Sequence, residues 1–219
     1  MTLHDRLMSV DERWSQERLD DVFKIWKLDK ERQAGLLDLR QRVADVDHWK
    51  NDPYEIVRWL NEFKGDVAKA ERLFRYTIQW RLENNVETHL ERYGEPHRMF
   101  HYLPTGILEG TDKQGDPIYL DRMGAADSYT LMKEFGVHGV IDYMIFFYEH
   151  ISRREFWQEH EKRTGRRVTN FSVVIDLEGL NAGHMRPGLL PLLQKVSRMT
   201  QDCYAGWGKV RTRLLRHGS

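Results

Sequence analysis

This sequence is poor in the features that mark several large protein classes. Its 219 residues contain one cysteine, Cys203, which excludes an intrachain disulfide and a cysteine-rich zinc site. A lone thiol suits a reducing compartment, so we expect a cytoplasmic protein. The longest apolar cluster, Tyr143 to Tyr148, is far too short to span a bilayer. The N-terminal stretch MTLHDRLMSVDERW lacks the apolar region of a signal peptide.

An excess of charge of either sign is also missing. Lys and Arg together number 34, as do Asp and Glu, so the formal net charge is zero. Such a balance provides no global attraction to nucleic acid or to anionic membranes. The 40% hydrophobic and 31% charged residues fit a soluble globular protein with one or two domains. We therefore expect no nucleic-acid partner. We also expect a monomer.

The first ninety residues carry helical patterns. Leu19, Val22, Phe23 and Trp26 recur at the spacing of one helix face. Asp52-Pro53 predicts a helix start, and Lys64-Gly65-Asp66 predicts a break, after which Asp66 caps a longer helix. The predicted buried stripe of that helix is Val67, Ala70, Leu73, Phe74, Ile78 and Arg81. Together these patterns predict a small helical bundle.

The most informative stretch runs from His101 to Gly124. Two extended apolar segments flank the polar turn 111–117, in which Asp112 and Gly115 are turn formers. Pro117 resists helix, so the return strand is predicted to begin near Ile118. The stretch therefore predicts a β-hairpin.

The second half of the chain alternates between helix and strand patterns. We predict a helix over 136–158, a basic connection over 162–167, a buried strand over 171–179 and a helix over 189–203. A hairpin followed by helix, strand and helix predicts an α/β layered domain.

Four of these segments resemble the CRAL-TRIO, or Sec14-like, lipid-binding family in order and spacing. The helical part has IVRWLNEFKGDVAKA and later Trp80-Arg81, similar to the family pattern LLRFLRARKFD-x-x-KA…WR. The hairpin resembles P-x-G…TD-x-x-G-x-P-[VI]-Y, and 173–179 resembles V-x-x-[IV]-x-D-x-x-G. The helix before Tyr204 resembles the segment that ends in Q-x-x-YPE.

The resemblance implies an α/β fold with a helical N-terminal domain and the first part of a mixed or parallel sheet flanked by helices. We assign 1–92 to the helical domain, 93–204 to a partial lipid-binding domain and 205–219 to a non-matching basic tail. The family implies a non-enzymatic carrier that needs no cofactor and no metal. It binds or transfers a hydrophobic ligand at membranes: a phospholipid (as in phosphatidylinositol transfer), tocopherol, retinal or another isoprenoid. We therefore expect a peripheral, transient contact with a membrane surface.

The resemblance also implies ligand-binding residues. Asp112 matches a position that contacts inositol, and Tyr119 matches an aromatic contact to choline, for which a cation over a tyrosine ring gives the physical basis. The family pattern has two adjacent basic residues in its RARKFD segment, and only one of these charges remains here, at Lys64. Phe171 and Val173 replace polar groups that hold choline phosphate, which favours a less polar ligand.

The family continues with a strand after the position of Tyr204 and with a gate helix. Here 209–217 form a basic run with little strand alternation, so we expect no strand, a product truncated near Tyr204 and an unpaired edge on the strand at 171–179. A cavity that lacks one wall leaves part of a bound lipid in water, so we expect weak or no lipid transfer. The exposed strand edge predicts low solubility. The alternative function is a lipid-free regulatory or protein-interaction module.

Other residues have competing interpretations. Asp176 and Glu178 follow a strand as a catalytic or metal-binding pair would, but contacts with nearby backbone are the more ordinary role. Cys203 lies on an apolar stripe, which favours a core position over a nucleophile. The aromatic cluster 143–148 is compatible with a ligand cavity or with an ordinary core.

Overall fold

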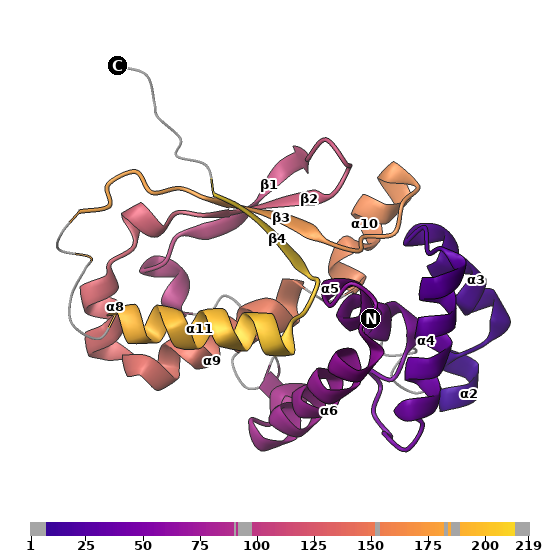
Figure 1. The fold of residues 1–219 in the computed structure, drawn as a ribbon. Helices are drawn as coiled ribbons and strands as arrows, with labels where there is room; N and C mark the ends of the chain where they lie inside the picture. Colours follow the sequence, from indigo (N-terminus) through magenta and orange to yellow (C-terminus); the bar gives the residue numbers. More distant parts are fainter. Residues whose placement is uncertain are drawn as a thin grey trace. The chain divides into compact units, whose positions relative to one another are not determined.

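The structure of this chain is a computed structural model that describes residues 8–89, 91, 98–151, 154–181, 184 and 189–212. The chain folds as two compact units (Figure 1). The first unit comprises Met1–Glu87, Arg153–Phe156 and Gln201–Gly206. The second comprises Thr88–Ser152, Trp157–Thr200 and Trp207–Ser219. Helices and one mixed sheet make up the fold, which confirms the predicted α/β class.

The first unit is helical, and its helix starts follow the predicted caps. Asp52 accepts a hydrogen bond from Tyr54 N at the start of α5, and Asp66 accepts one from Lys69 N at the start of α6. Between them Lys64 has a φ of 55°, a left-handed conformation that ends α5. The helices are α2 (Val10–Arg13), α3 (Gln16–Ile25), α4 (Lys30–Arg42), α5 (Pro53–Glu62) and α6 (Val67–Glu83).

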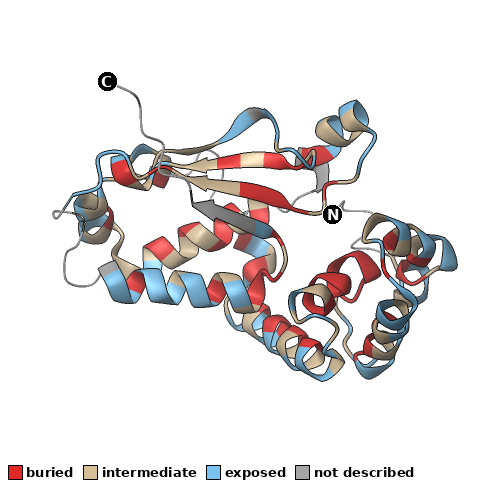
Figure 2. Ribbon diagram, turned by 45° about the horizontal axis from the view of Figure 1, so that its top comes forward, coloured by how far each residue is buried: buried red, intermediate tan, exposed pale blue. Residues whose placement is uncertain are grey.

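Helix α5 is the centre of the first unit. Its residues from Pro53 through Leu60 are buried, whereas α4 and α6 bury only one side (Figure 2). Trp59 of α5 meets Phe74 of α6 edge to face, with ring centroids 5.3 Å apart. The predicted α6 stripe is buried at Ala70, Phe74, Ile78 and Arg81 and half-buried at Val67 and Leu73.

The segment 201–206 packs into the first unit although it is distant in sequence. Ala205 lies in the same hydrophobic core as α5, and Thr77 Oγ1 donates a 2.9 Å hydrogen bond to Asp202 O. Trp80 contacts Tyr204 edge to face, with ring centroids 6.1 Å apart. This segment is therefore an integral part of the helical unit.

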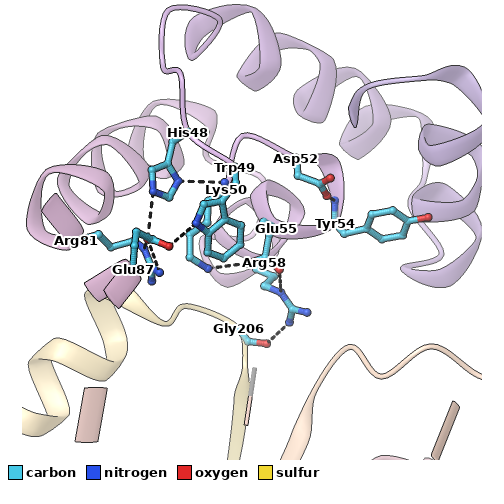
Figure 3. A network of polar contacts seen from close by, with 10 residues as sticks. All are labelled: His48, Trp49, Lys50, Asp52, Tyr54, Glu55, Arg58, Arg81, Glu87 and Gly206. Atoms are coloured by element: carbon cyan, nitrogen blue, oxygen red, sulfur yellow. Dashed lines mark hydrogen bonds and ion pairs between the residues drawn. The ribbon is translucent and has the colours of Figure 1, made fainter. Parts of the chain in front are cut away.

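Buried charges reinforce that attachment (Figure 3). The Glu55 carboxylate lies 2.9 Å from Lys50 Nζ and 3.9 Å from Arg58 Nε, and all three residues are buried. Arg58 Nη1 donates a 3.4 Å hydrogen bond to Gly206 O. Burial by itself would raise the pKa of Glu55, but the charges of Lys50 and Arg58 outweigh it and lower that pKa to about 2. Glu55 is thus held ionised inside the unit.

The second unit contains a four-stranded sheet in the order β1-β2-β3-β4 (Figure 1). β1 and β2 are antiparallel, while β3 runs parallel to both β2 and β4. The strands are β1 (Thr105–Thr111), β2 (Pro117–Asp121), β3 (Phe171–Ile175) and β4 (Gly208–Thr212). The helices of this unit are α8 (Ser128–Glu134), α9 (Gly136–Ile151) and most of α10 (Arg154–Thr164) and α11 (Leu189–Cys203), whose start and end, respectively, belong to the first unit. Short 3-10 turns lie at Arg98–His101 and Met123–Ala125.

The predicted hairpin and final helix are confirmed as β1–β2 and α11, and the return strand begins at Pro117. Two boundaries differ from the prediction. α9 ends at Ile151 and α10 reaches Thr164, so part of the predicted basic connection is helical. The strand predicted over 171–179 stops at Ile175. The next residue, Asp176, accepts a hydrogen bond through its Oδ1 from the backbone N–H of Glu178, which forms a turn.

The expectation of no strand after Tyr204 was wrong. β4 pairs in parallel with the whole of β3, from Phe171 opposite Gly208 to Ile175 opposite Thr212. β3 therefore has a neighbour on each side, and the predicted unpaired edge is wrong as well. Ladder hydrogen bonds use only the backbone, and charged side chains are common on edge strands, so weak alternation concealed this strand.

Helix α9 connects two hydrophobic clusters of the second unit because it is apolar nearly all round. Phe147 and Ile151 pack on the sheet with Tyr119 and Phe171, while Tyr143 and Phe146 pack with Met99, Leu131 and Leu192. None of the described helices is both long enough and apolar enough to cross a membrane.

We predict that Glu55→Gln destabilises the protein by about 3–5 kcal/mol, because it leaves Lys50 and Arg58 as buried charges without a full counter-charge. Urea unfolding measures the change. The matched control is Glu62→Gln, an exposed residue at the end of the same helix, which should stay within about 0.5 kcal/mol of wild type. Equal stability of the two variants would contradict the role given to Glu55.

The same carboxylate predicts a pH dependence. A group whose pKa is lowered on folding stabilises the native state above its unfolded value, here 4.5, and loses that contribution as the pH falls toward about 2. The stability difference between wild type and Glu55→Gln should therefore shrink as the pH falls from 4.5 to 2. Urea unfolding of both proteins across that range measures it, and a difference that stays constant would be inconsistent with a lowered Glu55 pKa.

Candidate functional site

Three of the predicted site residues share one face of the sheet. Tyr119 on β2 lies opposite Val173 on β3 in the parallel register, and Phe171 is two residues before Val173. Because side chains alternate along a strand, all three project toward the same side. Tyr119 and Phe171 are 7% and 1% exposed and pack against Phe147, with Tyr119 and Phe147 ring centroids 4.4 Å apart. We call this the α9 face of the sheet.

The α9 face also carries hydroxyl groups. Thr105 is the first residue of β1. Its Oγ1 lies 3.4 Å from the hydroxyl oxygen of Tyr143, and its side chain is also hydrogen-bonded with Tyr119. Burial raises the pKa of Tyr143 to about 12, and burial also raises the pKa of Tyr119. Both phenols are therefore neutral at physiological pH. The face thus combines an apolar layer with a few neutral hydrogen-bonding groups, the usual make-up of a site for a hydrophobic ligand.

Sequence reasoning missed an acidic residue on the same face. Asp121 follows Tyr119 by two positions on β2, and its Oδ1 is enclosed without a hydrogen-bond partner. Burial raises the pKa of this carboxyl to about 6. Strand alternation alone would have placed Asp121 beside Tyr119, so the signal was present in the sequence.

Asp112 has a structural position in the hairpin turn. Its Oδ1 accepts hydrogen bonds from Gln114 N at 2.8 Å and Asp116 N at 3.0 Å. Its Oδ2 accepts a 2.6 Å hydrogen bond from Ser172 Oγ on β3. Ser172 alternates with Phe171 and Val173 and therefore points away from the α9 face. The carboxylate thus closes the turn and ties it to β3.

Lys64 belongs to the first unit and is exposed at the turn between α5 and α6. The structure therefore brings together Tyr119, Phe171 and Val173, and adds Asp112 to the same sheet through Ser172. A ligand-binding role for Lys64 stays a prediction.

Two turns that each contain a glycine meet beyond the ends of β2 and β3. Gly124 N donates a 3.0 Å hydrogen bond to Asp176 O. A Cβ on Gly124 would lie 2.1 Å from Glu178 O, and one on Gly179 would lie 2.9 Å from Gly124 O. Only glycine allows these backbones to approach so closely. The carbonyl oxygen and the Oδ1 of Asp176 thus accept hydrogen bonds from backbone N–H groups. Its Oδ2 lies 3.6 Å from Arg122 Nε.

Other candidate reactive groups have ordinary environments. Glu178 is exposed, and Cys203 is buried, with burial raising the pKa of its thiol to about 12. Within the described ranges, no three His, Cys, Asp or Glu side chains gather as a metal site requires. The Cys203 environment is that of a core residue, as the sequence favoured.

The turn geometry predicts that Asp112→Ala destabilises the protein by about 1–3 kcal/mol, since the partly buried donors Asp116 N and Ser172 Oγ lose their acceptor. Asp112→Asn should cost less because its side-chain oxygen can still accept from the turn. Urea unfolding compares the two. If Asp112→Ala were as stable as wild type, the structural role would be refuted.

Comparisons with known proteins agree with this architecture. Residues 104–207, from the start of the hairpin to the residue before β4, match the CRAL/TRIO domain. Protein real-time of Drosophila pseudoobscura pseudoobscura is 31% identical over 181 residues, which cover 81% of this chain and 27% of that protein. A phosphatidylinositol/phosphatidylcholine transfer protein of Arabidopsis thaliana is 24% identical over 181 residues, covering 80% of this chain and 29% of that protein.

A CRAL-TRIO domain-containing protein of Caenorhabditis elegans is 32% identical over 145 residues, which cover 66% of this chain and 20% of that protein. This chain thus spans less than a third of the length of these three curated relatives. The resemblance drawn from the hairpin and strand motifs is confirmed. The chain carries a CRAL/TRIO domain at residues 104–207.

Proposed function

We propose that this chain binds a hydrophobic lipid on the α9 face of its sheet. The observation that carries the proposal is the aromatic and aliphatic layer formed by Tyr119, Phe171 and Val173 against α9, inside the CRAL/TRIO domain. Val173 is the half-buried member of this layer, and burying apolar lipid surface against it is favourable by about 25 cal/mol per Å². The neutral hydroxyls of Tyr119 and Tyr143 supply the few polar contacts that orient a bound ligand.

Transfer between membranes is the biological role that we propose for this binding. The Arabidopsis relative is named for phosphatidylinositol/phosphatidylcholine transfer, and similar presentation of a lipid at a membrane would suit a cytoplasmic, peripheral protein. Phe171 and Val173 offer no hydrogen bonds to a phosphate group. They favour a ligand less polar than a phospholipid headgroup, such as a tocopherol, a retinoid or another isoprenoid.

A lipid-free interaction module is the competing function. Its sequence argument was a truncated pocket, in which a strand and the gate helix of the family were expected to be missing. The strand is present, because β4 pairs with β3 along its full length. The structure therefore gives the lipid-free role less support than the sequence did, and the experiment below decides between the two.

We predict that the purified chain retains a lipid in about equimolar amount, detected by native mass spectrometry followed by lipid extraction. Val173→Phe should reduce occupancy about tenfold, because overpacking an apolar layer typically costs about 1–3 kcal/mol. Leu82→Phe, at a residue of α6 that is 59% exposed, serves as the control for an added ring and should retain the lipid. Circular dichroism checks that both variants fold. A folded wild-type chain that carries no lipid and takes none from vesicles would favour the lipid-free module.

A further inference from the structure

Asp121 is placed among the groups that we assign to ligand binding, yet its Oδ1 is enclosed and accepts no hydrogen bond from any described residue. It ends β2 and pairs in register with Thr105 of β1 and with Ile175 of β3. Because it follows Tyr119 by two residues, its side chain projects toward the α9 face. The carboxylate is therefore at the end of the layer formed by Tyr119, Phe171 and Val173.

Among the described residues, no positive charge compensates the Asp121 carboxylate. Its Oδ1 is enclosed and accepts no hydrogen bond, and burial is the one cause of its raised pKa. The neighbouring basic residue, Arg122, lies instead 3.6 Å from Asp176 Oδ2. No cation within the described ranges offsets the charge of Asp121.

The titratable groups that face Asp121 are phenols. Its negative charge contributes to the raised pKa values of Tyr119 on β2 and of Tyr143 and Tyr148 on α9. The pairing partners Thr105 and Ile175 do not titrate. The phenol of Tyr148 is in addition hydrogen-bonded with Thr200 of α11. The local groups are thus neutral, and none of them donates to Oδ1.

An enclosed carboxylate oxygen without a donor is unfavourable, and buried polar atoms in proteins are seldom left so. Two events relieve it: protonation, or the arrival of a donor on a ligand. A hydroxyl or amino group on a bound lipid would supply that donor, whereas a phosphate would add a second negative charge. An ether would supply only another acceptor.

We propose that Asp121 is the polar contact of the lipid site and selects lipids whose polar end carries a hydrogen-bond donor, a hydroxyl or an amino group. This inference rests on the proposed lipid binding and deepens it by naming the ligand class. It explains why a carboxylate occupies an otherwise apolar and phenolic face. It also adds a specificity residue to the three site residues found on that face from the sequence.

The inference includes a pH signature. Above about pH 6 the carboxyl is ionised and can only accept, so a donor-bearing lipid is favoured. Below that pH the protonated carboxyl can itself donate, so an ether-bearing lipid becomes a competitor. The preference for a donor should therefore be larger at pH 8 than at pH 5.

The test compares oleyl alcohol with oleyl methyl ether, two probes with the same chain that differ in the donor. Each displaces the fluorophore N-phenylnaphthylamine from the delipidated full chain. We expect wild type to prefer the alcohol about tenfold at pH 8, the size of one charge-assisted hydrogen bond, and less at pH 5. Asp121→Leu should bind both probes alike, while Asp121→Asn should keep a smaller preference that no longer changes with pH.

Glu159→Gln, which removes an exposed carboxylate of α10, is the control and should behave as wild type. If wild type binds both probes but Asp121→Leu keeps the preference for the alcohol, the role of Asp121 is refuted and lipid binding stands. If wild type binds neither probe and carries no lipid, both proposals fail. Should Asp121→Leu not fold, the pH profile of Asp121→Asn decides: an unchanged wild-type profile refutes the inference.

Discussion

The ionised carboxylate of Glu55 is the constraint on which the first unit depends. It compensates two buried cations, Lys50 and Arg58, and the second of these holds the carbonyl of Gly206. Buried ion pairs often add little net stability compared with apolar residues, but they penalise any arrangement that leaves one member alone. Glu55 therefore acts mainly by disfavouring other arrangements of 201–206 against α5 and α6, and it adds less to the net stability of the arrangement that is seen.

The elements that could be predicted from the sequence are those determined by local chemistry. Asp52 and Asp66 satisfy free backbone donors at helix starts, and the turn at Asp112 closes through its own neighbours. Helix α11 could be predicted because its apolar residues recur at the spacing of a single helix face. Such signals lie within a few residues of one another, which is why the hairpin, the start of α6 and the limits of α11 could be predicted closely.

The elements that the sequence concealed depend on distant partners. β4 exists because β3 offers it a backbone ladder, and its own residues alternate weakly. The turn role of Asp112 was readable, but its bond to Ser172 joins residues sixty positions apart. At the site, alternation could have added Asp121 to Tyr119. That Asp121 Oδ1 finds no hydrogen-bond donor among the described residues depends on how α9 packs against the sheet, which the sequence does not show. The periodicity of a single sequence indicates on which face of an element a side chain lies, but it does not identify the distant residues that contact that side chain.

The sheet register described above has a consequence for the order in which this domain forms. β2 is antiparallel to β1 across a short turn, but its other neighbour, β3, joins through pairs such as Ile118 with Ser172, far apart along the chain. Closing a long loop is entropically costly and slow compared with forming a hairpin. On a ribosome, β1 and β2 emerge and pair well before β3 exists. The β2 edge of the nascent hairpin then stays unpaired until α9, α10 and β3 have been synthesised, and during that interval it can pair with other chains.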